Sequence, residues 1–227
     1  MNLSEKYVLV TGASSGIGRA IALGCASAGA DLAITYRRNR EGAEETAALI
    51  RERGRRVEVI EADVGREEDI ASLVQALRSR FGRVDAWINN AGADILTGEG
   101  GRLSRGEKLD LLLRVDLRGT ILASWAAVDL MHEQPRGGVI INMSWDHVGV
   151  GMGGENPTLY SAAKGGILSF SKSLARKVAP QIRVNVLAPG FIETSFGESA
   201  TEQWRREVVE RTPLKRWGAP ADLAGAA

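Results

Sequence analysis

Apolar residues recur along the chain in two alternating patterns, one typical of strands and one typical of helices. Short apolar, β-branched runs predict strands at residues 7–10, 32–35, 57–60, 84–88, 138–143 and 182–187. Between these runs the apolar residues recur at helical spacing, which predicts helices up to about residue 28 and over residues 40–53, 67–81, 105–131 and 158–179. Strands and helices that alternate at this interval form parallel βαβ units. We therefore expect one α/β domain over residues 1–227, built on a doubly wound, mostly or wholly parallel sheet with helices on both faces.

Two segments interrupt this alternation. Residues 149–154 are glycine-rich and predict a flexible loop, and residues 195–211 predict a polar helical insertion after the last strand. Doubly wound sheets bind ligands beyond the carboxyl ends of their strands. The loops that follow Val10, Ile88, Met143 and Leu187 should therefore meet in one crevice that receives the substrate.

Composition narrows the choice of partners. The net charge is +1 and basic residues are scattered among acidic ones, so neither a nucleic acid nor an anionic membrane partner is expected. Cys25 is the single cysteine and lies in an apolar helical pattern, which favours a buried, inert thiol. No run is apolar enough to span a bilayer and no leader precedes the first strand, so we expect a cytoplasmic protein. We predict no metal site.

A glycine-rich turn follows the first strand and leads into a helix. Gly12, Gly16 and Gly18 leave backbone N–H groups and the positive helix end free to face a diphosphate. Such a loop can also be a purely structural turn, but its place directly after the first strand favours phosphate binding.

Tyr160 and Lys164 project from one face of a predicted helix, one turn apart. A neighbouring cation favours the phenolate form of a tyrosine, so the pair can exchange a proton with a carbonyl oxygen. The same spacing also arises where a tyrosine simply packs on a lysine stem.

Five motifs in register resemble those of the short-chain dehydrogenase/reductase family, of the 3-oxoacyl-carrier-protein reductase type, and together they cover almost the whole chain. They are Thr11-Gly-x3-Gly-x-Gly18, Asp63-Val64, Asn89-Asn-Ala-Gly92, Tyr160-x3-Lys164 and Pro189-Gly190-x-Ile192-x-Thr194. The resemblance implies a Rossmann domain, with Tyr160 as proton donor and with Lys164 holding the nicotinamide ribose and lowering the pKa of the tyrosine. It implies cofactor contacts at Gly12, Ser14, Ser15, Gly16, Ile17, Gly18, Asp63, Val64, Asn89, Ala91, Gly92, Pro189, Gly190, Ile192 and Thr194. Asn89 and Asn90 can equally be a turn that closes a strand.

The choice between the two nicotinamide cofactors depends on charge after the second strand. A carboxylate there accepts hydrogen bonds from a ribose 2′-hydroxyl, whereas a 2′-phosphate prefers arginine. Here Tyr36 is followed by Arg37 and Arg38, and no carboxylate occurs before Glu41. We therefore expect NADP(H) in preference to NAD(H), with Arg37 as the phosphate partner and Arg38 as a second partner or a solvated surface charge.

Asp116 departs from the family pattern, which usually has an asparagine at this place in a proton relay. The residue falls in an apolar stripe with Leu112 and Leu113, so it should face inward and need a partner. The hypothesis is that Asp116 keeps the relay geometry and places a charge beside Lys164. The alternative is a carboxylate satisfied by backbone amides.

The family's usual catalytic serine is also missing. Trp145 stands where it is expected at the end of the fifth strand, and counting back thirteen residues from Tyr160 reaches His147. Ser144 can replace the hydroxyl if the chain twists there, and Asp146 or His147 are other candidate donors. His147 can also be an ordinary loop residue, and Trp145 can simply form a wall of the pocket.

The sequence favours an NADPH-dependent oxidoreductase that transfers hydride to a ketone, an aldehyde or a 3-oxoacyl thioester, with sugars and small cyclic ketones as further candidates. The alternative is a catalytically weak or inactive dinucleotide-binding protein of the same fold, because the serine and the asparagine are replaced. The resemblance implies a homodimer or homotetramer formed through residues 105–131 and 158–179. The resemblance implies a further strand beyond the helix that opens at Pro220, so we expect either that this chain is a shortened form or that its sheet lacks that C-terminal strand.

Overall fold

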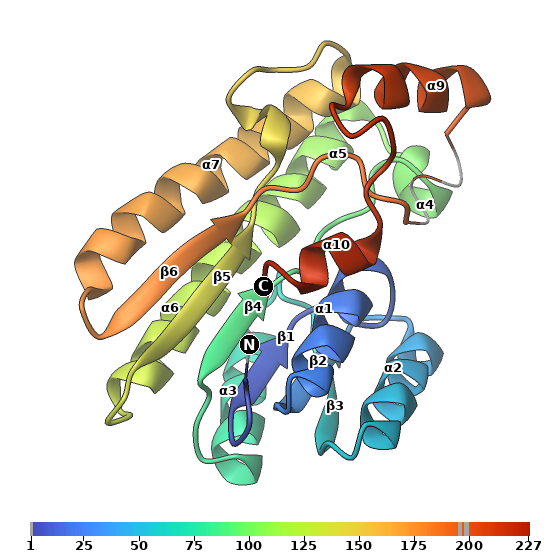
Figure 1. The fold of residues 1–227 in the computed structure, drawn as a ribbon. Coiled ribbons are helices and arrows are strands. Elements are labelled where there is room, and N and C mark those ends of the chain that lie inside the picture. The colour runs from blue at the N-terminus through green and yellow to red at the C-terminus, as the bar shows by residue number, and fades with distance from the viewer. Residues whose placement is uncertain (1, 195–196, 198–199) are drawn as a thin grey trace.

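The computed structural model describes residues 2–194, 197 and 200–227. In this part of the chain six strands form one sheet in the order β3-β2-β1-β4-β5-β6, and every neighbouring pair is parallel (Figure 1). The single α/β domain with a doubly wound sheet is therefore confirmed. The strands are β1 (Tyr7–Val10), β2 (Asp31–Tyr36), β3 (Val57–Glu61), β4 (Ala86–Asn89), β5 (Gly138–Met143) and β6 (Ile182–Leu187).

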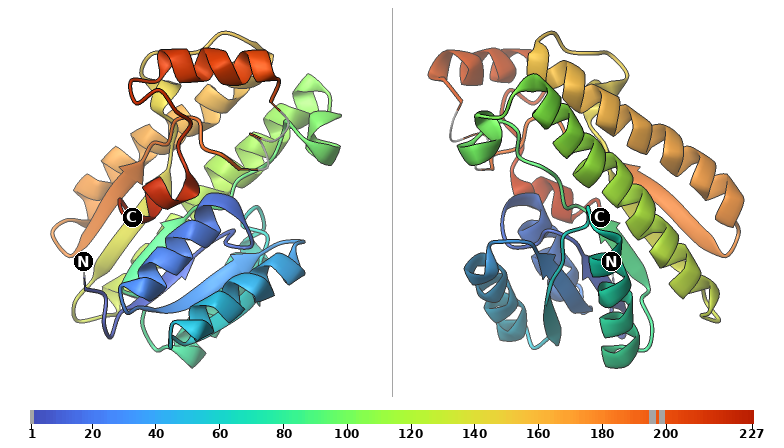
Figure 2. Two further views of the ribbon diagram at one scale, coloured as in Figure 1. Left: turned by 45° about the vertical axis from the view of Figure 1, so that its right-hand side comes forward. Right: turned by 180° about the vertical axis from the view of Figure 1, so that it is seen from behind.

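Helices cover both faces of the sheet (Figure 2). One face carries α1 (Gly16–Ser27), α2 (Arg40–Glu52) and the short α10 (Pro220–Ala224), over a core that includes Val8, Val10 and Cys25. Burial raises the pKa of the Cys25 thiol to about 11, so the predicted inert cysteine is neutral at physiological pH. On α10, Asp222 pairs with Arg216, which holds the pKa of that carboxyl at about 2.

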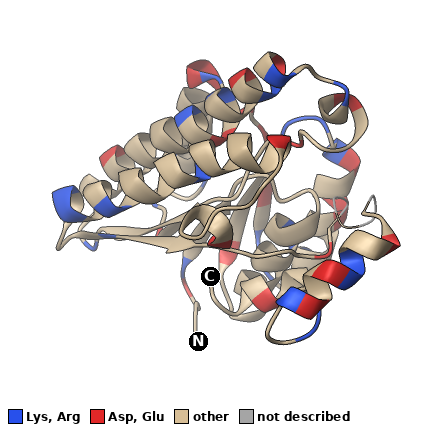
Figure 3. Ribbon diagram, turned by 90° about the horizontal axis from the view of Figure 1, so that it is seen from above, with Lys and Arg blue, Asp and Glu red and all other residues tan. Residues whose placement is uncertain are grey.

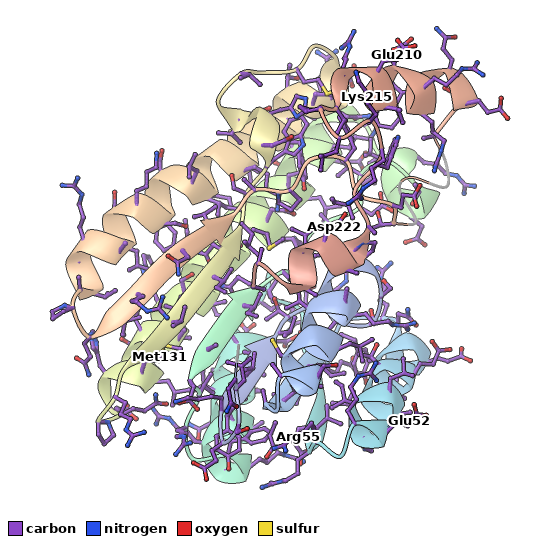
Figure 4. All side chains as sticks on the ribbon, in the orientation of Figure 1. Glu52, Arg55, Met131, Glu210, Lys215 and Asp222 are labelled. Atoms are coloured by element: carbon purple, nitrogen blue, oxygen red, sulfur yellow. The ribbon has the colours of Figure 1, made fainter. Side chains whose placement is uncertain are left out.

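The opposite face carries α3 (Glu67–Arg80), α6 (Gly119–His132) and α7 (Glu155–Val178). The core between these helices and the sheet includes Leu9, Trp87 and Met131, the last labelled in Figure 4. Leu9 lies on this face while its neighbours Val8 and Val10 lie on the other, because successive strand residues point to opposite faces. Both layers of helices bury apolar surface, and this holds the sheet rigid beneath its loops.

The helix predicted over residues 105–131 is divided in the structure. It comprises α5 (Arg105–Leu112), a π-helical turn η1 (Leu113–Arg118) and α6. Ser104 caps α5 by accepting a hydrogen bond from the backbone N–H of Glu107. Wide π turns inside helices occur frequently at functional sites, and this one contains Asp116.

Three short elements lie above the carboxyl ends of the strands. They are α4 (Gly98–Gly101), the 3₁₀ turn η2 (Asp146–Val148) and α9 (Glu202–Arg211), of which α4 and α9 are labelled in Figure 1. Sequence patterns missed α4, because three of its four residues are glycine. The helical insertion predicted at residues 195–211 is present as α9, although residues 195–196 and 198–199 lie outside the described part.

Charged residues of both signs are interspersed, mainly on helices and loops (Figure 3). None of the helices in the described ranges combines the length and the apolar character that a bilayer crossing requires.

Candidate active site

A cavity of about 1090 Å³ lies beyond the carboxyl ends of the strands, where the sequence places the substrate crevice. It brings together every predicted site residue except Asn89 and the candidate donors Asp146 and His147. Its lining includes Gly12, Ser14, Ser15, Gly16, Ile17, Gly18, Arg37, Arg38, Asp63, Val64, Ala91, Gly92, Asp116, Ser144, Tyr160, Lys164, Pro189, Gly190, Ile192 and Thr194.

The glycine turn forms one wall of this cavity. Gly12 and Gly16 have φ values of 65° and 55°, which glycine adopts without strain. At Gly18 a Cβ atom would lie 2.4 Å from the carbonyl oxygen of Gly12, so only glycine permits this close packing. Helix α1 begins at Gly16, and the Ser15 side chain does not cap it. The first N–H groups of α1 are therefore available to an anionic group in the cavity.

Asn89 does not lie where we expected it. Its side chain points away from the cavity into the core, where it accepts a hydrogen bond from Trp87 Nε1 at 2.8 Å and donates to Asn142 Oδ1 at 2.8 Å. Asn90, the next residue, lines the cavity, and its Nδ2 donates to the carbonyl oxygens of Thr11 and Gly12 at 2.9 and 3.1 Å. The prediction for the Asn89 side chain is therefore wrong, because strand alternation exchanges the two side chains.

Two arginines follow β2 at the end of the cavity. The Nη1 atom of Arg37 lies 3.8 Å from Asp63 Oδ2. Arg38 is more exposed, at 73% of its side chain, and pairs with Glu99 at 2.8 Å. Arg37 is thus directed toward the predicted adenosine side of the cavity, whereas Arg38 already has a surface carboxylate partner.

Tyr160, Lys164 and Asp116 form a connected group of titratable side chains. The Lys164 Nζ atom lies 2.9 Å from Asp116 Oδ1 and 5.2 Å from the centre of the Tyr160 ring. The other oxygen of Asp116 accepts a hydrogen bond from the N–H of Ala93 at 2.8 Å. Lys164 also donates to the carbonyl oxygen of Met143 at 3.3 Å. The two alternatives for Asp116 are therefore both present, because the carboxylate pairs with the Lys164 ammonium and also accepts a hydrogen bond from a backbone amide.

The pKa values of Tyr160 and Lys164 both lie above the ordinary values of these side chains. Burial raises the pKa of the Tyr160 phenol, Lys164 lowers it, Asp116 raises it, and the resulting pKa lies above the ordinary tyrosine value. The predicted lowering of this pKa by Lys164 is present, but burial and the Asp116 carboxylate outweigh it. Burial would lower the pKa of Lys164, but Asp116 and Tyr160 reverse the effect and raise it. Near neutral pH the site holds a protonated phenol beside a lysine ammonium.

Ser144 does not present its hydroxyl to the cavity as a free donor. Its Oγ donates to the carbonyl oxygen of Lys164 at 2.9 Å, and the residue is buried. The structure thus gives no support to Ser144 as a replacement for the missing catalytic hydroxyl. His147 and Asp146 pair with each other, Nδ1 to Oδ1, at 2.5 Å, and neither lines the cavity. Trp145 does line it.

An aromatic cluster adjoins Tyr160. Phe191 contacts His147 at 5.4 Å between ring centres and Trp204 at 4.9 Å, and both Phe191 and Trp204 line the cavity. Backbone hydrogen bonds with Gly218 hold residues 191–193 in place. Sequence patterns did not identify Phe191 or Trp204, because a loop and the polar helix α9 carry them. Within the described residues no three His, Cys, Asp or Glu side chains gather as a metal site requires.

The family follows from comparison with known proteins. A family model described as enoyl-(acyl carrier protein) reductase matches residues 12–227. The chain belongs to the short-chain dehydrogenase/reductase family. It is accordingly an NAD(P)-dependent oxidoreductase, as the names of its relatives also indicate.

Among those relatives, L-rhamnose 1-dehydrogenase (NAD(P)(+)) of Sphingomonas sp. is 37% identical over 98% of this chain and 87% of the relative. The 3-oxoacyl-[acyl-carrier-protein] reductase FabG of Staphylococcus epidermidis is 34% identical over 97% of this chain and 88% of its own length. A short-chain dehydrogenase from Burkholderia cenocepacia, solved in complex with NADP, is 33% identical with a TM-score of 0.87, over 100% of this chain and 90% of that one. These relatives differ in substrate, so the family alone leaves the substrate open.

Proposed function

We propose that this short-chain dehydrogenase/reductase is an NADPH-dependent carbonyl reductase in which Tyr160 protonates the carbonyl oxygen. The cofactor supplies a hydride to the carbonyl carbon, and the protein supplies the proton and the alignment. The observation that carries the proposal is the position of Tyr160 on the cavity wall, one helical turn from Lys164, which is ion-paired with Asp116. A phenol with a raised pKa holds its proton near neutral pH, which suits the direction of reduction.

The residues present fit a dinucleotide. The uncapped first turn of α1 offers backbone N–H groups to a diphosphate, and Gly12 and Gly16 keep side chains out of its way. Asp63 and Val64 line the cavity and would contact the adenine, and Lys164 on the same cavity wall would hold the nicotinamide ribose. Ala91, Gly92, Pro189, Gly190, Ile192 and Thr194 complete the proposed cofactor contacts.

Arg37 favours NADPH over NADH. Its guanidinium lies near the carboxylate of Asp63 at a distance of 3.8 Å, which is too long for a strong hydrogen bond. A 2′-phosphate would give it a charge-assisted and better matched partner. Arg38 is committed to Glu99 and contributes a positive potential rather than a contact.

The substrate end of the cavity favours a carbonyl compound with an apolar body. Its walls include Ile95, Leu96, Met152, Phe191 and Trp204. Apolar and aromatic walls bind apolar surface and offer few hydrogen bonds to the hydroxyl groups of a sugar. A ketone, an aldehyde or a 3-oxoacyl group with a hydrocarbon chain or ring meets this requirement.

We also propose that α6 and α7 mediate a homodimer or homotetramer. Trp125 on α6 is 50% exposed, and Leu113, at the start of the π turn η1 that precedes α6, is 38% exposed. Both lie within residues 105–131, the segment that the sequence predicts as an interface, and exposed apolar patches are typical of interfaces. Light scattering coupled to gel filtration measures the oligomeric state, and a monomer at all concentrations would refute this part.

The function is tested by fluorescence titration with NADPH and NADH, followed by a carbonyl panel while the absorbance of the reduced nicotinamide is recorded. The panel contains cyclohexanone, ethyl 3-oxobutanoate, a 3-oxoacyl thioester and aldose sugars. Tighter binding of NADPH and consumption with an apolar ketone or 3-oxo compound support the reductase. Tight binding with no consumption across the panel would favour the catalytically weak dinucleotide-binding protein.

A further inference from the structure

We propose that the indole N–H of Trp145 is the second hydrogen-bond donor to the substrate carbonyl oxygen, beside Tyr160. This inference rests on the proposed reductase function. A carbonyl oxygen has two lone pairs, and it gains negative charge as hydride reaches the carbon. Tyr160 meets one lone pair and gives up its proton. A second donor aimed at the same oxygen stabilises the charge that develops there.

Trp145 is buried, with 8% of its surface exposed, yet it lines the cavity. Among the described residues its Nε1 makes no hydrogen bond, and this atom is not one of the fully enclosed polar atoms. Buried indole N–H groups usually have a partner, as in Trp87, whose Nε1 donates to Asn89 Oδ1 at 2.8 Å. The Trp145 N–H differs, since in the described part of the chain it has neither a protein partner nor full enclosure, and it is available to a ligand atom in the cavity that the residue lines.

The packing around Trp145 fixes its indole beside the proton donor. Its ring meets the Tyr160 ring edge to face, with centres 5.3 Å apart and an interplanar angle of 73°. On its other side the indole stacks on His147, with centres 4.8 Å apart and an angle of 22°. The hydrogen bond from His147 to Asp146 holds that imidazole in place. The histidine therefore acts as a support for the indole rather than as a donor to substrate.

The neighbouring polar groups are engaged elsewhere. The Ser144 hydroxyl donates to the carbonyl oxygen of Lys164, and Asp146 and His147 stand outside the cavity. Asn156 borders the cavity one turn before Tyr160, and its Oδ1 accepts from Lys108 Nζ at 3.2 Å, but it lacks the ring contact that Trp145 makes with Tyr160. Trp145 is thus the donor that combines a free N–H with direct contact to Tyr160.

An indole N–H also behaves differently from a hydroxyl in this position. It donates but does not accept, and it does not ionise in the working pH range. Trp145 can therefore polarise the carbonyl without entering a proton relay, so the transferred proton comes from Tyr160 alone. The ring in addition extends the aromatic wall toward Phe191, which favours the apolar body of the substrate.

The experiment observes the indole N–H groups by NMR in protein labelled with ¹⁵N-tryptophan. The chain has five tryptophans, and the signal absent from Trp145→Phe identifies Trp145. Oxidised cofactor is added first, and then the panel ketone that the enzyme reduces most efficiently, a combination that cannot react. A downfield shift of the Trp145 proton on addition of the ketone supports the proposal. Binding of the ketone without that shift would overturn it.

Kinetics give a second readout. Trp145→Phe keeps the ring and removes the N–H, so it should lower kcat by about a hundredfold with little change in KM. Trp145→Ser should recover part of the loss if its hydroxyl reaches the same oxygen. The matched variant Trp204→Phe alters the same cavity wall and should act on KM rather than on kcat. Equal effects of the two Phe variants on kcat would contradict the assignment. If the wild type binds no cofactor or reduces no ketone, the reductase proposal itself fails. That result differs from a failure of the Trp145 assignment, in which the wild type is active and only the predicted effect of Trp145→Phe is missing.

Discussion

Asp116 Oδ1 and Lys164 Nζ lie 2.9 Å apart in an ion pair whose side chains are 1% and 5% exposed. A pair removed this far from water is costly to form and more costly to break from one side. The π turn η1 carries Asp116, and the helix α7 carries Lys164. The pair thus connects the two helices across the floor of the site and determines the charge that Tyr160 experiences.

Asp116→Asn should move the alkaline limit of reduction to lower pH. The carboxylate raises the pKa of the Tyr160 phenol, so its removal lowers that pKa and the phenol loses its proton earlier as pH rises. The measurement is the pH profile of kcat for wild type and variant with the same ketone. An unchanged or higher limit would contradict the role assigned to the carboxylate.

Asp116→Ala is the companion variant for stability. It leaves Lys164 buried without a carboxylate, which should lower the free energy of unfolding by about 3–5 kcal/mol. The raised pKa of Lys164 means that its contribution is fully present below the ordinary lysine pKa of 10.5 and is lost as pH rises through the higher folded value. Urea unfolding at neutral pH should therefore show the whole effect, and a loss below 1 kcal/mol would indicate that the pair is exposed to water.

Arg37→Ala should weaken NADPH binding by about 10- to 150-fold, because a charge-assisted hydrogen bond to phosphate contributes about 1.5–3 kcal/mol. NADH lacks the phosphate, so its affinity should change little. Arg38→Ala is the matched control, since that side chain is mostly exposed and paired with Glu99. Fluorescence titration of the wild type and both variants with each cofactor measures the six affinities, and an equal loss for both cofactors in Arg37→Ala would remove Arg37 from the phosphate site.

The adjacent asparagines should separate stability from cofactor binding. Asn89→Ala leaves buried partners such as Asn142 and Trp87 unsatisfied, so it should destabilise the fold by about 1–3 kcal/mol. Asn90→Ala frees the glycine turn at Thr11 and Gly12 and should weaken NADPH and NADH to a similar degree. Thermal unfolding and cofactor titration of both variants provide the check. If Asn89→Ala weakened cofactor binding while Asn90→Ala destabilised the fold, Asn89 would belong to the cofactor site after all.

Local patterns predicted the fold and most of the cavity. Each strand combines a β-branched run with a turn signal, and parallel strands bring their following loops to one edge. The glycine turn, Tyr160 and Lys164 were therefore found from sequence. The π turn at η1 was not, because an altered hydrogen-bond spacing leaves the apolar stripe around Asp116 unchanged.

Tertiary contacts account for the remaining differences. The direction of Asn89 depends on which residue ends β4, and a shift of one residue exchanges the two faces. The Ser144 hydroxyl is occupied by a carbonyl group twenty residues further along the chain. Phe191 and Trp204 approach the site only because their loop and α9 fold over it. None of these contacts has a signal in local spacing or composition.

The central claim is that Tyr160 supplies the proton in an NADPH-dependent reduction. The measurement is a comparison of wild type with Tyr160→Phe, using NADPH titration and ketone-dependent loss of reduced-cofactor absorbance on the same samples. The account predicts that the variant binds NADPH nearly as well and loses turnover by at least about a hundredfold. A Tyr160→Phe enzyme with intact NADPH binding and the turnover of the wild type would contradict it.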